Sequence, residues 1–149
     1  MRFFELIFYL SFTAIMMIEF VIGLRFITAD RIMDYHQIAM GVPWANLGFG
    51  VQTMSLNFLR TAGLGFLLQG FSIGFFLAVF KIHQSKLVSW FLLSLCLAQS
   101  GMMISIVTQV RYHTPAAPPL TPFILLLFLS LIGFLAAQKH LMHPSPEEK

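Results

Sequence analysis

Charged residues are scarce in this chain of 149 residues: Lys, Arg, Asp and Glu together make up 10% of it, whereas hydrophobic residues make up 58%. An average soluble domain is roughly 25% charged. So few charges could not cover the surface of a soluble protein of this size, so the composition predicts a chain embedded in the lipid bilayer. The net charge of +3 is scattered without a basic run, which argues against nucleic acid as a partner.

Cysteine is nearly absent, and histidine is absent from the long apolar segments. Cys96 is the single cysteine, which excludes an intrachain disulfide and a multi-cysteine metal site. Haem held between helices needs histidines inside the spans, so a b-type cytochrome is disfavoured. The chain also has no HExxH motif and no phosphate-binding loop. We therefore expect no metal, no cofactor and no catalytic residue, which favours a protein that is not an enzyme.

Long apolar runs are what the chain has in abundance. A transmembrane helix needs about 20 mostly apolar residues. Four segments qualify, namely 4–25, 51–82 with its apolar part at 61–80, 87–110 and 120–139. We predict a single all-α integral membrane domain, with four transmembrane helices in an antiparallel bundle. The polar tail 143–149 is expected to be disordered.

The linker 26–50 between the first two spans is longer and more polar than the other connections. Residues 30–40 place Ile32, Tyr35 and His36 on one face at helical spacing, with acidic residues opposite. Gly41 and Pro43 then end the pattern. We predict a short amphipathic interfacial helix that lies on the membrane surface.

The linker also resembles a known family. The residues that carry the resemblance are Tyr35-His36, Ala39, Gly41, Pro43-Trp44, Leu47, Gly50, Gln52-Thr53, Arg60 and Gly63. They are similar to a Y-H-x-x-A-x-G-x-P-W motif found in small four-helix bacterial inner-membrane proteins that have no assigned activity. Phe49 stands where that family has proline. The resemblance implies a bacterial inner-membrane location and no particular mechanism.

Small residues at helical spacing indicate how the predicted helices pack, because helices in lipid associate through close packing and polar contacts. The second span carries Gly63, Gly70 and Gly74 on one stripe. The third span carries a stripe made of Ser94, Ala98, Gly101, Ser105 and Thr108. We expect the two stripes to face each other across a short turn, although such stripes also serve partner proteins.

Gln69 and Gln99 fall near the middle of the second and third spans. A side-chain amide that faces lipid is costly. We therefore predict a hydrogen bond between the two glutamines that helps to hold the helices together. A polar substrate path or proton path is the less favoured interpretation.

The candidate ionic or ligand site lies on the linker face of the membrane. It comprises Glu19, Asp34, Tyr35, His36, Trp44, Asn57, Arg60 and Arg111. A carboxylate inside a span is costly unless it is paired, and Arg60 could reach inward along its aliphatic stem. We predict a contact between Glu19 and Arg60, either as a structural ion pair or as part of a functional site.

Three functions remain open at this stage. The first is a non-enzymatic accessory or scaffolding subunit, as a homo-oligomer or in a larger membrane complex, with the lipid bilayer as its surroundings. The second is a binding or transport protein for an anionic lipid headgroup or a small acid, using Glu19, His36, Arg60 and Arg111. A cavity lined by Glu19, His36, Asn57 and Arg60 would favour it. The third is a lipid- or quinone-linked enzyme, which needs an apolar slot beside Tyr35 or His36. A small excess of Lys and Arg on the terminal face favours both termini in the cytoplasm.

Overall fold

A computed structural model describes residues 3–142 of the chain, and it is all α-helical over this range. The elements, in order, are α1 (Phe3–Ile27), α2 (Asp34–Met40), a 3-10 turn (Trp44–Asn46), α3 (Phe49–His83), α4 (Lys86–His113) and α5 (Thr121–Met142). The predicted disorder of the tail 143–149 lies outside the described residues.

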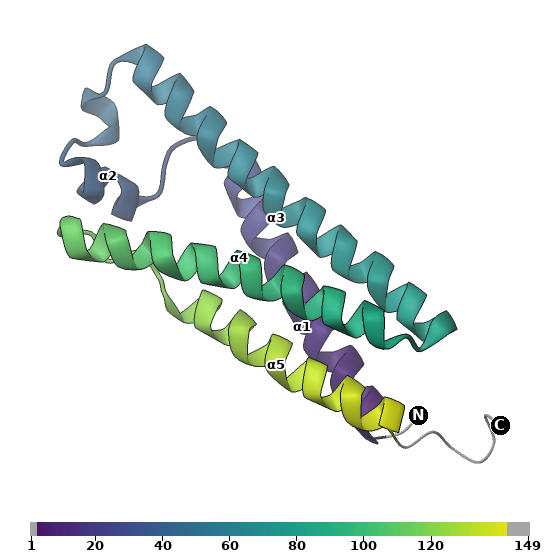
Figure 1. The fold of residues 1–149 in the computed structure, drawn as a ribbon. Helices are drawn as coiled ribbons and strands as arrows, with labels where there is room; N and C mark the ends of the chain where they lie inside the picture. Colours follow the sequence, from purple (N-terminus) through teal and green to yellow (C-terminus); the bar gives the residue numbers. More distant parts are fainter. Residues whose placement is uncertain (1–2, 143–149) are drawn as a thin grey trace.

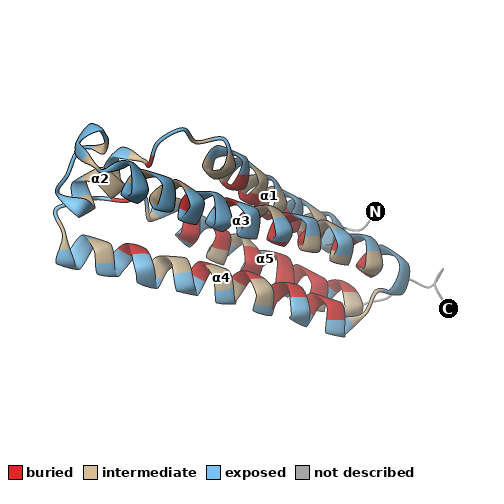
Figure 2. Ribbon diagram, turned by 90° about the horizontal axis from the view of Figure 1, so that it is seen from above, coloured by how far each residue is buried: buried red, intermediate tan, exposed pale blue. Residues whose placement is uncertain are grey.

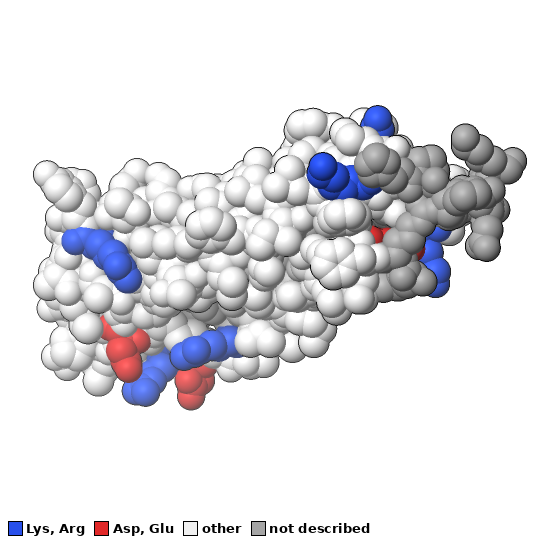
Figure 3. All heavy atoms as spheres, turned by 90° about the horizontal axis from the view of Figure 1, so that it is seen from below, with Lys and Arg blue, Asp and Glu red and all other residues white. Residues whose placement is uncertain are grey.

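Four helices, α1, α3, α4 and α5, are long and apolar enough to cross a membrane. The shortest of them has 22 residues, which at about 1.5 Å per residue exceeds the roughly 30 Å of the hydrocarbon layer. On the face drawn in Figure 3, the charged side chains gather at the two ends of the molecule and leave a broad uncharged band between them. The predicted four-helix membrane fold is therefore confirmed.

Local signals set the ends of the helices near the two connections. α3 ends where Gln84 adopts a left-handed conformation with φ of 44° and donates its N–H to the Phe80 carbonyl. The Ser85 hydroxyl then accepts from the Leu87 N–H, which caps the start of α4. α2 ends at Gly41, whose φ of 67° suits glycine.

The helices are arranged around α1 and form a bundle that is open on one side. α1 packs against α3 and α5, and α4 packs against α5. α3 and α4 meet little beyond their shared turn and diverge toward the other end of the molecule, where α2 and the linker lie (Figure 1). Of the consecutive spans, α1 and α3 pack closely, as do α4 and α5, whereas α3 and α4 pack poorly.

The glycine stripe of α3 packs against α1, so the prediction that it faces α4 is wrong. A Cβ atom added to Gly63 would lie 2.8 Å from the carbonyl oxygen of Gly23, and one added to Gly23 would lie 2.8 Å from the Gly63 carbonyl oxygen. Gly70 and Gly74 face Met16 and its neighbours on α1. Gly23 on α1 lies opposite Gly63, and because neither residue has a side chain, the two backbones approach closely there.

The small-residue stripe of α4 lies on the outside of the bundle, so its predicted packing role within the chain is also wrong. Its five residues Ser94, Ala98, Gly101, Ser105 and Thr108 are all exposed. A Cβ atom built on Gly101 would have no heavy atom within 4 Å. α4 instead turns its apolar positions Leu92 and Cys96 inward.

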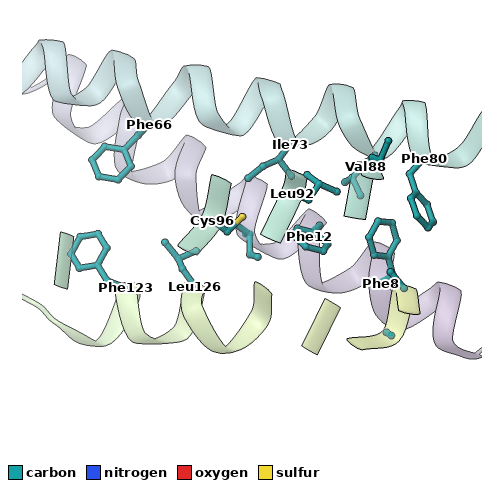
Figure 4. Packing of buried hydrophobic residues seen from close by; sticks show 14 of the residues in the cluster. Phe8, Phe12, Phe66, Ile73, Phe80, Val88, Leu92, Cys96, Phe123 and Leu126 are labelled. Carbon is teal, nitrogen blue, oxygen red and sulfur yellow. The ribbon is translucent and has the colours of Figure 1, made fainter. Parts of the chain in front are cut away.

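Buried aromatic and aliphatic side chains form one cluster that runs along the bundle, from Phe8 and Phe80 near the α3–α4 turn to Phe66 and Phe123 toward the linker (Figure 4). Phe8 and Phe12 of α1 are fully buried, and the Phe8 ring centroid lies 4.3 Å from that of Phe80. Gly133 of α5 lets the Phe12 ring approach its backbone. Figure 2 shows buried residues concentrated on the facing sides of the long helices, whereas the segment around α2 is mostly intermediate or exposed.

Candidate functional site

The linker between α1 and α3 is folded around one side chain, Gln37. Its Oε1 accepts from the Trp44 backbone N–H at 2.9 Å, and its Nε2 donates to the Ile32 carbonyl at 3.3 Å. Gln52 then donates to the Trp44 carbonyl at 2.8 Å, which ties the linker to the start of α3. Helical spacing alone gives no indication of this role for Gln37.

A cavity of about 420 Å³ lies beneath this linker. Its walls come from the last turns of α1 and α4, from α2 and from the proline-rich connection that leads into α5. Most of the lining is apolar: Ile22, Phe26, Met33, Met103, Ile106, Val107, Val110, Pro118, Pro119, Pro122 and Phe123. The remaining lining residues are Arg25, Tyr35 and His36. The volume falls in the range of small-molecule sites, roughly 300–1,000 Å³.

The rings of Tyr35 and His36 are in contact at this cavity, with centroids 4.3 Å apart and planes tilted by 58°. Burial lowers the pKa of His36 below its ordinary value, so the imidazole is neutral at pH 7. Burial also raises the pKa of Tyr35, and Arg25 partly opposes that shift. The His36 Nδ1 atom is buried and forms no hydrogen bond. The cavity therefore presents a phenol and an uncharged imidazole.

Arg25 is the cation at this cavity, and the sequence reasoning left it out of the site. It lies in the last turn of α1, is exposed and forms no hydrogen bond with another described residue. The missed signal was its position, because a basic residue in the last turn of α1 lies close along the chain to the linker that follows.

The two arginines that were expected to bind a ligand are engaged in holding the backbone. Arg111 donates through Nε and Nη2 to the Pro118 carbonyl at 3.1 and 2.7 Å. Arg60 donates to the Ala29 carbonyl at 3.4 Å. Neither lines the cavity. Arg111 instead fixes the connection that forms one cavity wall.

The other predicted site residues are dispersed. Asn57 lies on an exposed side of α3, beside Thr53 and Thr61. Asp34 accepts a weak hydrogen bond from Gln37 at 3.4 Å, and Trp44 packs within the linker. Of the eight predicted residues, the cavity brings together Tyr35 and His36. The anticipated cavity lined by Glu19, His36, Asn57 and Arg60 does not form as such.

Glu19 is fully buried and does not contact Arg60, so that prediction is wrong. Its Oε2 accepts a long hydrogen bond of 3.5 Å from Gln99 Nε2, and its Oε1 has no partner. Arg60 of α3 is exposed and bonds to Ala29, which follows the end of α1 and lies ten residues along the chain from Glu19. Because Glu19 points into the bundle, its hydrogen-bond partner is the amide of Gln99 on α4 and not Arg60.

The predicted hydrogen bond between Gln69 and Gln99 is wrong as well. The Gln99 amide is given to Glu19, and Gln69 Nε2 is buried without a partner. Glu19 and Gln99 each lie one turn from residues of the cavity floor, Ile22 and Met103 respectively. The buried polar pair thus sits directly below the apolar cavity.

Comparison of the chain with protein-family models, curated proteins and solved structures finds no match. Among residues 3–142, no three His, Cys, Asp or Glu side chains are grouped as a metal site would require.

Proposed function

We propose that this protein binds an amphiphilic membrane molecule with an anionic headgroup. The apolar part of the molecule occupies the cavity, and the headgroup lies at Arg25 beside Tyr35 and His36. The observation that carries the proposal is the apolar cavity of about 420 Å³ with an uncommitted guanidinium at its edge.

The chemistry of the lining supports this class of ligand. An apolar chain in the cavity would gain van der Waals contacts with the walls. Without such a ligand, lipid tails would have to fill this space. Arg25 offers a forked donor that matches carboxylate or phosphate oxygens. The Tyr35 hydroxyl adds a neutral donor, and the uncharged His36 adds no repulsive or competing charge.

Binding is favoured over catalysis by the surroundings of His36. A histidine that works as a general acid or base is usually oriented by a hydrogen bond to its second ring nitrogen. The buried Nδ1 of His36 has no such partner. The proposal places the protein in the bacterial inner membrane, with both termini in the cytoplasm and α2 at the level of the lipid headgroups.

The experiment measures binding of a dansyl-labelled undecanoic acid to the purified protein in lipid nanodiscs. Replacing Arg25 by Gln is expected to weaken binding about tenfold, because a hydrogen bond to a charged group contributes about 1.5–3 kcal/mol. Ile106→Trp, which fills the cavity from α4, is expected to weaken it as well.

Arg31→Gln is the matched control, because Arg31 is an exposed arginine that does not line this cavity. A dansyl-labelled undecanol, which lacks the anionic group, is expected to bind equally to the parent protein and to Arg25→Gln. Unchanged affinity in both Arg25→Gln and Ile106→Trp would reject the proposal.

A second role, as a homo-oligomer, is favoured by the exposed small-residue stripe of α4. Gly101 at its centre is open to the surroundings, and such a surface lets another helix approach closely. The partner in this hypothesis is a second copy of the chain. Gly101→Leu is expected to abolish cross-linking of the dimer by a chemical reagent in membranes. Gly65→Leu on α3 is the control. A dimer that survives Gly101→Leu would exclude this interface.

A further inference from the structure

A second polar site lies deeper in the bundle than the cavity. Glu19 of α1, Gln69 of α3 and Gln99 of α4 are buried or half-buried inside membrane-spanning helices. Polar side chains at such depth are costly unless their hydrogen-bonding groups are satisfied. Two of their atoms, Glu19 Oε1 and Gln69 Nε2, are buried and have no partner.

Helix register places these groups at one depth. Gly23 of α1 faces Gly63 of α3, and Met16 faces Gly70 and Gly74. Because the two helices are antiparallel, the α3 residues level with Glu19 lie between these contacts, and Gln69 is among them. The hydrogen bond from Gln99 brings α4 to the same level. Three helices therefore each contribute one polar side chain to a single layer.

The charge state of Glu19 follows from its surroundings. No Arg, Lys or His forms a hydrogen bond or ion pair with it in residues 3–142. Cys96 of α4 is the other titratable group that faces it. An ionised carboxylate in this position would be an uncompensated buried charge, which is strongly unfavourable. The neutral acid is the form that this environment accepts.

If Glu19 is a neutral acid, each of its oxygens has a defined role as hydrogen-bond donor or acceptor. Oε2 accepts from Gln99, so it is the carbonyl oxygen, and Oε1 carries the proton. Oε1–H and the Gln69 Nε2 amide are then two buried donors in one layer that form no hydrogen bond. A single oxygen placed between them would satisfy both. The layer has the form of a site whose missing component is a hydrogen-bond acceptor.

We propose that Glu19, Gln69 and Gln99 form a binding site for one neutral acceptor oxygen, that of a water molecule or of a carbonyl group on a membrane-soluble molecule. The site is distinct from the headgroup position at Arg25, because it offers uncharged donors and lies one turn below the cavity floor. Ligand or water would reach it through the cavity.

The test is infrared spectroscopy of the full-length protein in nanodiscs at neutral pH. The stretching band of a protonated carboxyl is expected, and Glu19→Gln identifies it by its loss. Transfer to D2O exchanges the carboxyl proton and is expected to shift the band downward if water reaches the site. A shift that occurs only when a decyl-substituted benzoquinone is added assigns the oxygen to a membrane-soluble carbonyl compound.

Gln69→Leu removes one of the two donors, so it is expected to shift the Glu19 band. Gln109→Leu, at an exposed glutamine of α4, is the matched control and leaves the band in place. Arg25→Gln is also expected to leave it in place, which separates this proposal from the one concerning the headgroup. The D2O and quinone measurements need no variant, so a variant that fails to fold does not weaken the test.

Two results would overturn the proposal. One is a spectrum in which Glu19 contributes an ionised carboxylate at neutral pH. The other is a protonated band that responds neither to D2O nor to the quinone, because it would mean that the layer is dry and only structural.

Discussion

The two halves of this bundle differ in how they are filled. Near the α3–α4 turn, Phe8, Phe12 and Phe80 occupy the space between the helices and are almost completely buried. Near the linker, α3 and α4 have diverged, and a cavity of about 420 Å³ remains. In lipid, helix association depends on van der Waals contact rather than on a hydrophobic drive. The half near the α3–α4 turn is therefore packed by large rings, whereas the linker half combines packed residues with an apolar space.

The largest expected effect breaks the half near the α3–α4 turn. Phe8→Ala removes a fully buried ring that packs on Phe80, and it is expected to lower the free energy of unfolding by about 3–5 kcal/mol. Denaturation with SDS in mixed micelles measures the change. Phe128→Ala is the control, since Phe128 is 58% exposed and should be close to neutral. Equal effects at the two positions would contradict the comparison.

The next effect tests the contact between α1 and α3. Gly63→Val would place side-chain atoms against the Gly23 backbone, where even a Cβ lies at 2.8 Å. The expected destabilisation is about 1–3 kcal/mol, because neither backbone can yield easily. Gly65→Val is the matched control two residues away, since a Cβ there meets nothing within 4 Å. Both variants are measured by the same denaturation assay.

The smallest expected effect is a pH dependence of the stability of the linker half. Burial lowers the pKa of His36 in the folded protein relative to the unfolded chain. The unfolded state therefore binds more protons once the pH falls to about 6.5 and below, and the linker loses stability in that range until the folded-state pKa is passed. Stability is fully present above this window.

Amide hydrogen exchange of residues 28–48 measures this pH effect. Protection is expected to fall as the pH is lowered through about 6.5, the ordinary pKa of histidine in an unfolded chain. His36→Gln should remove the dependence, whereas His113→Gln, at an exposed position, should preserve it. A pH dependence that persists in His36→Gln would assign it to another group.

Hydropathy and turn residues predicted the four spans and the short α3–α4 connection, because these depend on composition within one segment. The partner of each helix could not be predicted in the same way. The spacing of Gly63 and Gly70 shows that α3 has a smooth stripe, but any helix that approaches closely could use it. The single Gly23 on α1 decided the pairing, and nothing in the local pattern marks it.

The site was predictable in part for similar reasons. Tyr35 and His36 were found because helical spacing placed them on one apolar face with Ile32, although the helix itself begins only at Asp34. Arg25 was missed, and Arg60 was favoured instead, because both are arginines near the linker and only the path of the chain separates their roles. The partner of Glu19 came from α4, 80 residues away, where chain proximity gives no indication. The cavity is a space between elements and has no sequence pattern of its own.

The unequal lengths of the helices carry a mechanical consequence. α3 has 35 residues and spans about 52 Å, whereas α5 has 22 residues and spans about 33 Å. When bilayer thickness changes, α3 can adjust by tilting or by withdrawing its projecting turns, but α5 has almost no length in reserve. The strain of mismatch therefore falls on α5 and on Pro118 and Pro119 before it, which form one wall of the cavity. The thickness of the membrane thus sets the shape of the space in which a lipid-like ligand would be held.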